Sequence, residues 1–124
     1  MDMRPSARQQ ELIEVARTLA MGKFEPRAAE YDREARFPIV DYVDLRDAGF
    51  LGLGADLETY CLVVEEIAKG NAATALTFNM HCLTMLMIGE MADVHEMSDE
   101  KRVRHAELRA RNFREVVEDG VYYG

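Results

Sequence analysis

The chain has 124 residues, of which 48% are hydrophobic and 31% are charged, with three prolines and eight glycines. This length and composition fit one folded domain and exclude a disordered or low-complexity chain. The formal net charge of -8 disfavours non-specific binding to nucleic acid or to an anionic membrane, because both surfaces are themselves negatively charged. We therefore expect no nucleic-acid partner.

The first predicted helix begins at Ser6, where Ser6 and Gln9 have the spacing of a capping box. Apolar residues then recur at helical spacing and predict a buried stripe of Leu12, Ile13, Ala16, Leu19 and Ala20. Gly22 and Pro26 interrupt this pattern, so we expect a kink or a break there, with the helix resuming from residue 26 to about residue 33. The first ten residues lack the apolar run of a signal peptide, which predicts a cytoplasmic protein.

A short helix is predicted from Pro38 to Ala48, with Gly49 as its left-handed cap. Residues 50–56, FLGLGAD, are interpreted as a glycine-rich loop. The pair Gly52 and Gly54 is not followed by the third glycine of a phosphate-binding fingerprint, and no strand-like run precedes it. We therefore do not predict a nucleotide site in this loop.

Residues 57–92 are the most apolar and most clearly patterned stretch, with two helical patterns joined at residues 69–71. The first pattern begins at the N-cap Asp56 and predicts a buried stripe of Leu57, Tyr60, Cys61, Val64, Ile67 and Ala68. It leaves on the solvent side Glu58, Glu65, Glu66 and Lys69.

The second pattern has no Asp, Glu, Lys or Arg between Asn71 and Gly89. Such a helix is apolar nearly all round, which predicts a central helix with neighbours on every side. Its asparagines, threonines and histidine, and the lack of a flanking Lys/Arg cluster, favour a buried soluble helix over a membrane span.

The last predicted helix is capped by Ser98 and has Asp99 and Glu100 in its first turn. Its basic residues alternate with glutamates, so we interpret them as a solvated face rather than a binding site. The helix ends at Gly120, and its apolar seam consists of Val103, Ala106, Ala110, Phe113 and Val117. Since every predicted segment is helical, the expected fold is an all-α bundle.

Motifs for self-contained catalysis or metal binding are missing from the sequence. No histidine follows a glutamate by three residues, as a di-iron bundle requires, and there is no zinc-protease or G-x-S-x-G motif. Cys61 and Cys82 do not form a C-x-x-C pair and are predicted to be buried, reduced thiols. We therefore predict no metal site and assign no catalytic residue.

One face of the central helix mixes small hydroxyls with thioethers and consists of Thr77, Met80, His81, Thr84, Met87 and Ile88. Such a face suits the wall of a pocket for an apolar ligand, because methionine adapts its shape and threonine can bond a carbonyl or a water. The alternative is ordinary core packing. We interpret His81 itself as a hydrogen-bonded interior histidine rather than an acid or a base.

Three segments, EPRAAEYDREARFP, DLRDAGFLGL and LETYCLVVEEIAKGNAATALTFNMH, resemble in this order the N-terminal helical domain of acyl-CoA dehydrogenases and of related flavin-dependent monooxygenases. The resemblance implies a complete enzyme with a middle β-domain and a C-terminal helical domain, which hold most of the FAD and supply the catalytic base. We expect residues 1–124 to be a single helical domain that lacks both of those domains and is inactive alone.

The resemblance further implies that Thr77, Met80, His81 and Thr84 line the acyl-chain pocket of an acyl-CoA substrate. FAD is implied for the complete enzyme, with no tight binding by this chain, and so is a homo-oligomer. The sequence departs from the family between Leu53 and Gly54, where a loop resembling VPEEYGG is missing. The alternative hypothesis is a non-catalytic helical binding or self-assembly module, and both the acyl substrate and the choice between dehydrogenase and monooxygenase chemistry stay open.

Overall fold

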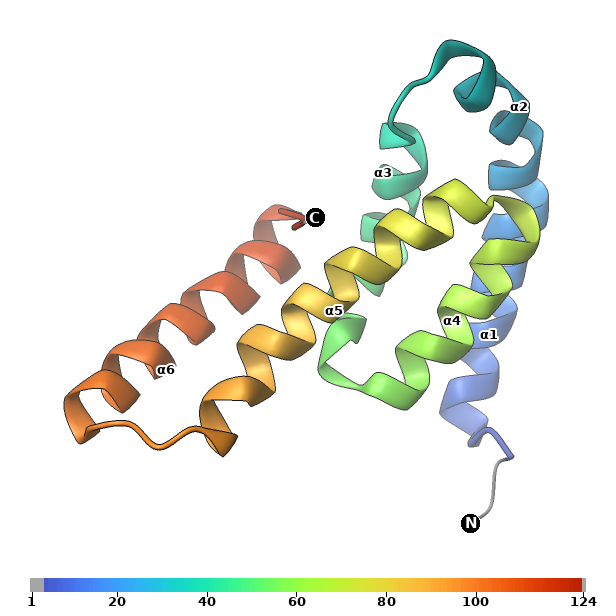
Figure 1. The fold of residues 1–124 in the computed structure, drawn as a ribbon. Coiled ribbons are helices and arrows are strands. Elements are labelled where there is room, and N and C mark those ends of the chain that lie inside the picture. Colours follow the sequence, from blue (N-terminus) through green and yellow to red (C-terminus); the bar gives the residue numbers. More distant parts are fainter. Residues whose placement is uncertain (1–3, 124) are drawn as a thin grey trace.

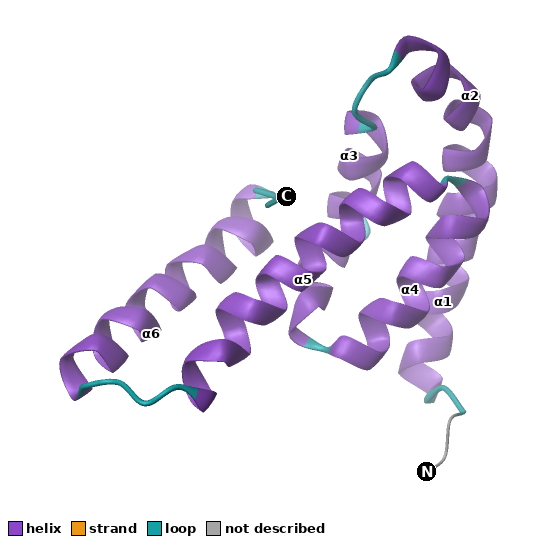
Figure 2. Ribbon diagram, in the orientation of Figure 1, coloured by secondary structure: helices purple, strands orange, loops and turns teal. Residues whose placement is uncertain are grey.

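The computed structural model describes residues 4–123, and the side chains of all of these except residues 54, 55, 91 and 92. All regular structure within the described range is helical, which confirms the predicted all-α class (Figure 2). The long helix α5 runs through the middle of the fold, with α1 and α4 on one side of it and α6 on the other (Figure 1).

The N-terminal helices form one nearly continuous rod. Helix α1 (Ala7–Leu19) begins with the predicted capping box, in which the Ser6 hydroxyl accepts from the Gln9 N–H and the Gln9 side chain accepts from the Ser6 N–H. The interruption expected at Gly22 and Pro26 is a π-helical turn, η1 (Ala20–Phe24), which leads directly into α2 (Glu25–Glu34). The chain does not break at Pro26, which lies in the first turn of α2 directly after the wider π turn.

Helix α3 (Ile39–Asp47) ends as predicted at Gly49, whose φ of 76° is left-handed. The next residues do not form the predicted loop but a 3-10 helix, η2 (Phe50–Ala55). Phe50 and Leu51 are both buried. Their burial anchors this segment against α5. The glycine pattern, from which the loop was predicted, does not indicate this burial.

Helix α4 (Leu57–Gly70) starts at Asp56, whose side chain accepts from the Thr59 N–H, as predicted. Its buried face is rotated from the predicted one and consists of Thr59, Tyr60, Val63, Glu66 and Ile67. Glu66, expected on the solvent side, is only 6% exposed. The Arg17 side chain of α1 donates to Glu66 and lowers the pKa of that carboxyl, with Lys69 acting in the same direction.

Helix α5 (Ala72–Val94) begins at Asn71, whose side-chain oxygen accepts from the N–H groups of Ala73 and Thr74. The prediction that α5 has neighbours on every side was wrong. Leu76 is 63% exposed, and other large apolar side chains on the same face of α5 are also exposed, namely Met80, Leu83 and Met87. Apolar composition fixes how much surface a helix can bury but not how many neighbours it has, and here one face stays open.

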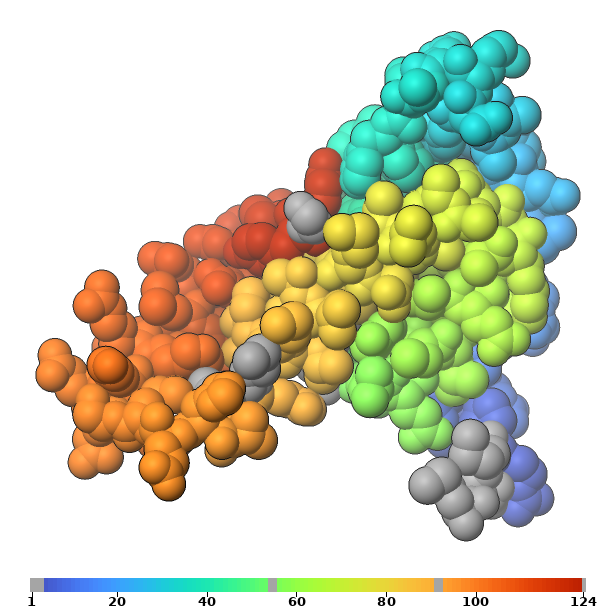
Figure 3. Space-filling model, viewed as in Figure 1, coloured from blue at the N-terminus to red at the C-terminus, as the bar shows by residue number. Residues whose placement is uncertain are grey.

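Helix α6 (Asp99–Arg114) begins at the predicted N-cap Ser98 and continues into a π-helical turn, η3 (Glu115–Asp119). It extends alongside the second half of α5 as an arm of the molecule (Figure 3). The predicted seam is wrong as a buried face, because Val103 is 61% and Val117 is 68% exposed and none of the described residues of α6 itself is buried, although Phe113 packs against the core and Val116 of η3 is buried. Val116 lies in the π turn η3 and belongs to the buried core.

A fully buried carboxylate joins three helices. Asp41 of α3 accepts from the Arg27 guanidinium of α2 at 2.9 Å and from the Thr74 hydroxyl of α5 at 2.7 Å. Arg27 also donates to Asp44 at 2.7 Å. Because a buried charge is tolerated only when it is paired and hydrogen-bonded, these contacts fix α2 and α3 against the first turns of α5.

Thr74→Val tests this network, because valine keeps the shape of threonine but leaves Asp41 without one hydrogen bond. We expect the free energy of unfolding to fall by about 1–3 kcal/mol, measured by urea denaturation. Thr84→Val is the matched control, since the Thr84 hydroxyl bonds only to the Met80 carbonyl of its own helix, and should change stability by less than about 0.5 kcal/mol. Equal losses in the two variants would contradict the role given to Thr74.

Gly70 is a point of close approach between α4 and the rod. A Cβ added there would lie 2.3 Å from the Ala20 carbonyl oxygen, whereas one added at Gly22 meets no atom within 4 Å. Gly70→Ala should therefore destabilise the fold by about 1–3 kcal/mol. Gly22→Ala should instead be neutral or stabilise by up to about 1 kcal/mol, because alanine is the better helix former. Thermal unfolding of both variants measures the difference, and a stable Gly70→Ala would contradict this packing.

Candidate functional site

Helix α5 carries the four residues predicted to line a pocket, and the structure separates them. Thr77 and Met80 line a surface hollow, whereas His81 is fully buried beside it. Thr84 lies one turn further along, half-buried, and its hydroxyl donates to the Met80 carbonyl at 2.9 Å. Thr77 and Met80 are thus the part of the predicted face that lines this hollow.

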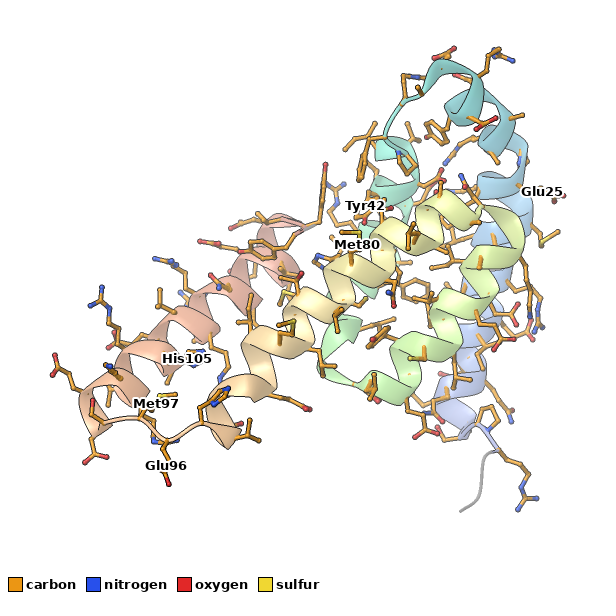
Figure 4. The ribbon with its side chains drawn as sticks, viewed as in Figure 1. Glu25, Tyr42, Met80, Glu96, Met97 and His105 are labelled. Carbon is orange, nitrogen blue, oxygen red and sulfur yellow. The ribbon has the colours of Figure 1, made fainter. Side chains whose placement is uncertain are left out.

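The hollow has a volume of about 250 Å³ and is bounded by α5, α3 and the residues that follow η3. Met80 is half-exposed, and Tyr42 approaches it from the neighbouring helix α3 (Figure 4). The lining is mainly apolar and consists of Phe37, Tyr42, Thr77, Met80, Tyr122 and Tyr123.

Three aromatic rings form one wall of the hollow. The ring centroids of Phe37 and Tyr42 are 5.1 Å apart, those of Tyr42 and Tyr122 are 4.6 Å apart, and the rings of Phe37 and Tyr122 are nearly parallel at 5.7 Å. Contacts of this kind hold the rings in place beyond the effect of area burial alone. Burial raises the pKa of Tyr42 to about 12, so its phenol remains neutral at physiological pH.

His81 is held by two backbone groups. Its Nε2 lies 2.7 Å from the Leu51 carbonyl oxygen, and its Nδ1 accepts from the Tyr123 N–H at 2.9 Å. Because a backbone N–H can only donate, Nδ1 is the unprotonated nitrogen and Nε2 carries the hydrogen. Burial lowers the pKa of His81, so the ring is neutral. This confirms an interior, hydrogen-bonded histidine, and both ring nitrogens are already engaged.

The two cysteines lie in different environments. Cys82 is buried, as predicted, and burial raises the pKa of its thiol to about 12. The prediction that Cys61 is also buried was wrong, since it lies on the exposed face of α4. Within the described part of the chain, no group of three His, Cys, Asp or Glu side chains could hold a metal ion.

The glycine pair in η2 does not provide an open phosphate cradle. A Cβ placed on Gly52 would lie 3.5 Å from the side chain of Val117, so η3 packs directly on this backbone. A dinucleotide such as FAD needs backbone N–H groups that are free to approach its phosphates. At Gly52, the segment that comes nearest to such a motif is therefore in contact with η3 rather than open to a phosphate.

A second, larger hollow of about 460 Å³ lies between α5 and α6. Its one cationic side chain, Arg109, already donates to the Gly89 carbonyl at 2.7 Å and lies 3.4 Å from Asp93.

Residues Ala72–Glu90 of α5 are long and apolar enough to cross a membrane by length and composition, with 33% of that window buried in the fold. The core helix of a soluble protein meets the same criteria, so one such helix is weak evidence for a membrane span.

Comparison with known proteins places this fold in a family. The family described as "Acyl-CoA dehydrogenase, N-terminal domain" matches residues 6–95. A probable acyl-CoA dehydrogenase of Mycobacterium tuberculosis is 37% identical over 75 residues, which are 53% of this chain and 19% of that protein. Cyclohex-1-ene-1-carbonyl-CoA dehydrogenase of Syntrophus aciditrophicus is 36% identical over 86 residues, 62% of this chain and 21% of that protein. No solved structure gives a significant match.

The chain spans about a fifth of the length of the curated relatives it matches. The family match includes Phe37, Tyr42, Thr77 and Met80 of the hollow and ends before Tyr122. Thr77 and Met80 were predicted from their helical spacing and from the resemblance of this segment to the family. No sequence pattern indicated that Phe37, Tyr42 and Tyr122 come together. Because the match covers well over half of the chain and the fold is helical as expected, the chain belongs to the acyl-CoA dehydrogenase family and contains its N-terminal domain.

Proposed function

We propose that this domain forms one wall of the acyl pocket in a flavin-dependent acyl-CoA dehydrogenase, and that Thr77 and Met80 are the residues that contact the acyl group. The observation that carries the proposal is the hollow beside these two residues in a domain of this family. Its volume of about 250 Å³ is just below the usual range for ligand pockets, which suits the end of a short acyl chain.

The hollow between α5 and α6 is larger, but two observations favour the one beside Met80. The family match contains four of its six lining residues but only four of the eight that line the larger hollow. The single cation of the larger hollow, Arg109, is occupied by protein oxygens. We assign His81 and Thr84 to the same wall in a supporting role, because neither side chain lines the hollow.

The oxidation of an acyl-CoA also needs a flavin to accept hydride and a base to remove the α-proton. We propose that FAD and the base are supplied by parts of the enzyme that correspond to the remaining four fifths of the relatives' length. When bound, FAD supplies the hydride acceptor, and the residues of this chain position the acyl group and exclude water from it. The complete enzyme is proposed to act in the cytoplasm as a homo-oligomer.

The 124-residue chain alone should not retain FAD. After incubation with excess FAD and gel filtration, we expect less than about 0.1 flavin per chain by visible absorbance, because the backbone at Gly52, in the segment nearest to a phosphate-binding motif, is in contact with η3. Acyl-CoA-dependent reduction of a dye should stay at background. A stoichiometric yellow complex would show that the cofactor site is carried by this chain.

Met80→Glu and Met87→Glu test the acyl wall as a matched pair. Both methionines are on α5 and are almost equally exposed, at 49% and 47%, but only Met80 lines the hollow. We expect butyryl-CoA to shift the methyl resonance of Thr77, which also lines the hollow, in a saturable way, and Met80→Glu to weaken this binding at least about tenfold, because a carboxylate disfavours an apolar ligand. Met87→Glu should bind within about twofold of the unchanged chain. Equal effects, or no saturable binding by the unchanged chain, would refute this wall.

The second candidate function is a non-catalytic self-assembly module. It is favoured by the open apolar face of α5, formed by Leu76, Met80, Leu83 and Met87, because such a face is normally covered by another protein surface. Sedimentation equilibrium separates the two functions. A monomer that binds butyryl-CoA supports the acyl wall, whereas a tight dimer without binding supports assembly.

A further inference from the structure

Residues 121–123, here named the strap, follow the left-handed Gly120 and return from η3 toward α5 and α3 (Figure 1). The Val121 N–H donates to the Glu115 carbonyl at 3.2 Å, which turns the chain back. The ring of Tyr122 then packs on Phe37 and Tyr42. The strap thereby supplies one side of the hollow beside Met80.

The strap is tied to the body of the fold through His81. The Tyr123 N–H donates to Nδ1 of His81 at 2.9 Å, and the two rings lie parallel, with an interplanar angle of 3° and centroids 6.4 Å apart. The other ring nitrogen of His81 is bonded to the Leu51 carbonyl of η2. The histidine is therefore a link between a fixed element, η2, and the end of the strap.

We propose that His81 is a positioning residue whose neutral ring latches the strap over the hollow, and that protonation of Nδ1 releases the strap and opens the hollow. The reason is the direction of the hydrogen bond. A proton taken from solvent by Nδ1 converts the acceptor of the Tyr123 N–H into a second donor, so two N–H groups then face each other and that bond breaks. The bond from Nε2 to Leu51 survives in either state.

Titratable and charged groups face the latch from α5, α3, η3 and α6. Cys82 on α5 and Tyr42 on α3 both have a pKa of about 12, so neither changes charge near neutral pH. Within the described residues, η2 contributes a backbone carbonyl, α3 also places Arg46 beside Gly120, and η3 contributes Glu115, which accepts from the Tyr123 hydroxyl at 3.3 Å. Arg111 of α6 lies 3.8 Å from Glu115.

The direction of the pH effect follows from burial, which lowers the pKa of His81. The latch is therefore closed above the ordinary histidine pKa of about 6.5 and is lost as the pH falls through the lower value of the folded state. This inference rests on the proposed function only for the identity of the ligand as an acyl group. The latch itself is measured without acyl-CoA, so its failure and the failure of the acyl wall can be told apart.

Nitrogen-15 NMR of the full chain tests the latch directly. We expect Nδ1 of His81 and the Tyr123 amide to shift together on acidification with one midpoint below about 6.5. The Tyr122 ring should lose the shifts caused by Phe37 and Tyr42 at the same midpoint, and protection of the Tyr123 amide should fall at least about tenfold. A Tyr122 ring that stays in place while His81 titrates would overturn the proposal.

Tyr123→Pro and Tyr123→Leu form the matched pair of variants and leave the buried histidine untouched. Proline removes the N–H that His81 accepts, whereas leucine keeps it and removes only the ring and hydroxyl. We expect Tyr123→Pro to release the Tyr122 ring at every pH and to raise the midpoint of His81, and Tyr123→Leu to keep a pH-dependent strap. Glu115→Gln should leave the midpoint in place. Identical midpoints in the proline and leucine variants, or a midpoint abolished by Glu115→Gln, would refute the latch.

Discussion

The buried carboxylate of Asp41 is the contact on which the position of the site depends. It joins Arg27 of α2 and Thr74 of α5. Tyr42 is the next residue along α3, and Thr77 lies three residues beyond Thr74 on α5. The bond between Asp41 and Thr74 therefore sets Tyr42 opposite Thr77, and both line the hollow. A buried ion needs this level of pairing to be tolerated, so the arrangement of α3 and α5 has little freedom to change.

The ends of the helices could be predicted from sequence, because caps depend on local chemistry. Ser6 with Gln9, Asp56 and Ser98 cap helices as expected, and Gly49 and Gly120 adopt the left-handed conformation. The buried faces were harder to predict. Glu66 is buried because Arg17, 49 residues away in the chain, pairs with it, and no local pattern encodes that partner.

The candidate site was predictable only in part for the same reason. Helical spacing placed Thr77 and Met80 on one face of α5, and both line the hollow. Tyr122 reaches the hollow because the π turn η3 and Gly120 redirect the chain. Its ring then packs on Phe37, which lies in the first third of the sequence. His81, unlike Thr77 and Met80, does not line the hollow, and its two ring nitrogens instead bond to η2 and to the strap.

Photoaffinity labelling tests the central claim, that the acyl group lies against Thr77 and Met80, most directly. The chain would be irradiated with a short acyl-CoA that carries a diazirine at the end of the acyl chain, and the adducts mapped by mass spectrometry. We expect labelling of the peptides that contain Thr77, Met80 and Tyr122, with loss of the label in Met80→Glu. Labelling confined to Ala106, Ala110 and Phe113, in the hollow between α5 and α6, would contradict it.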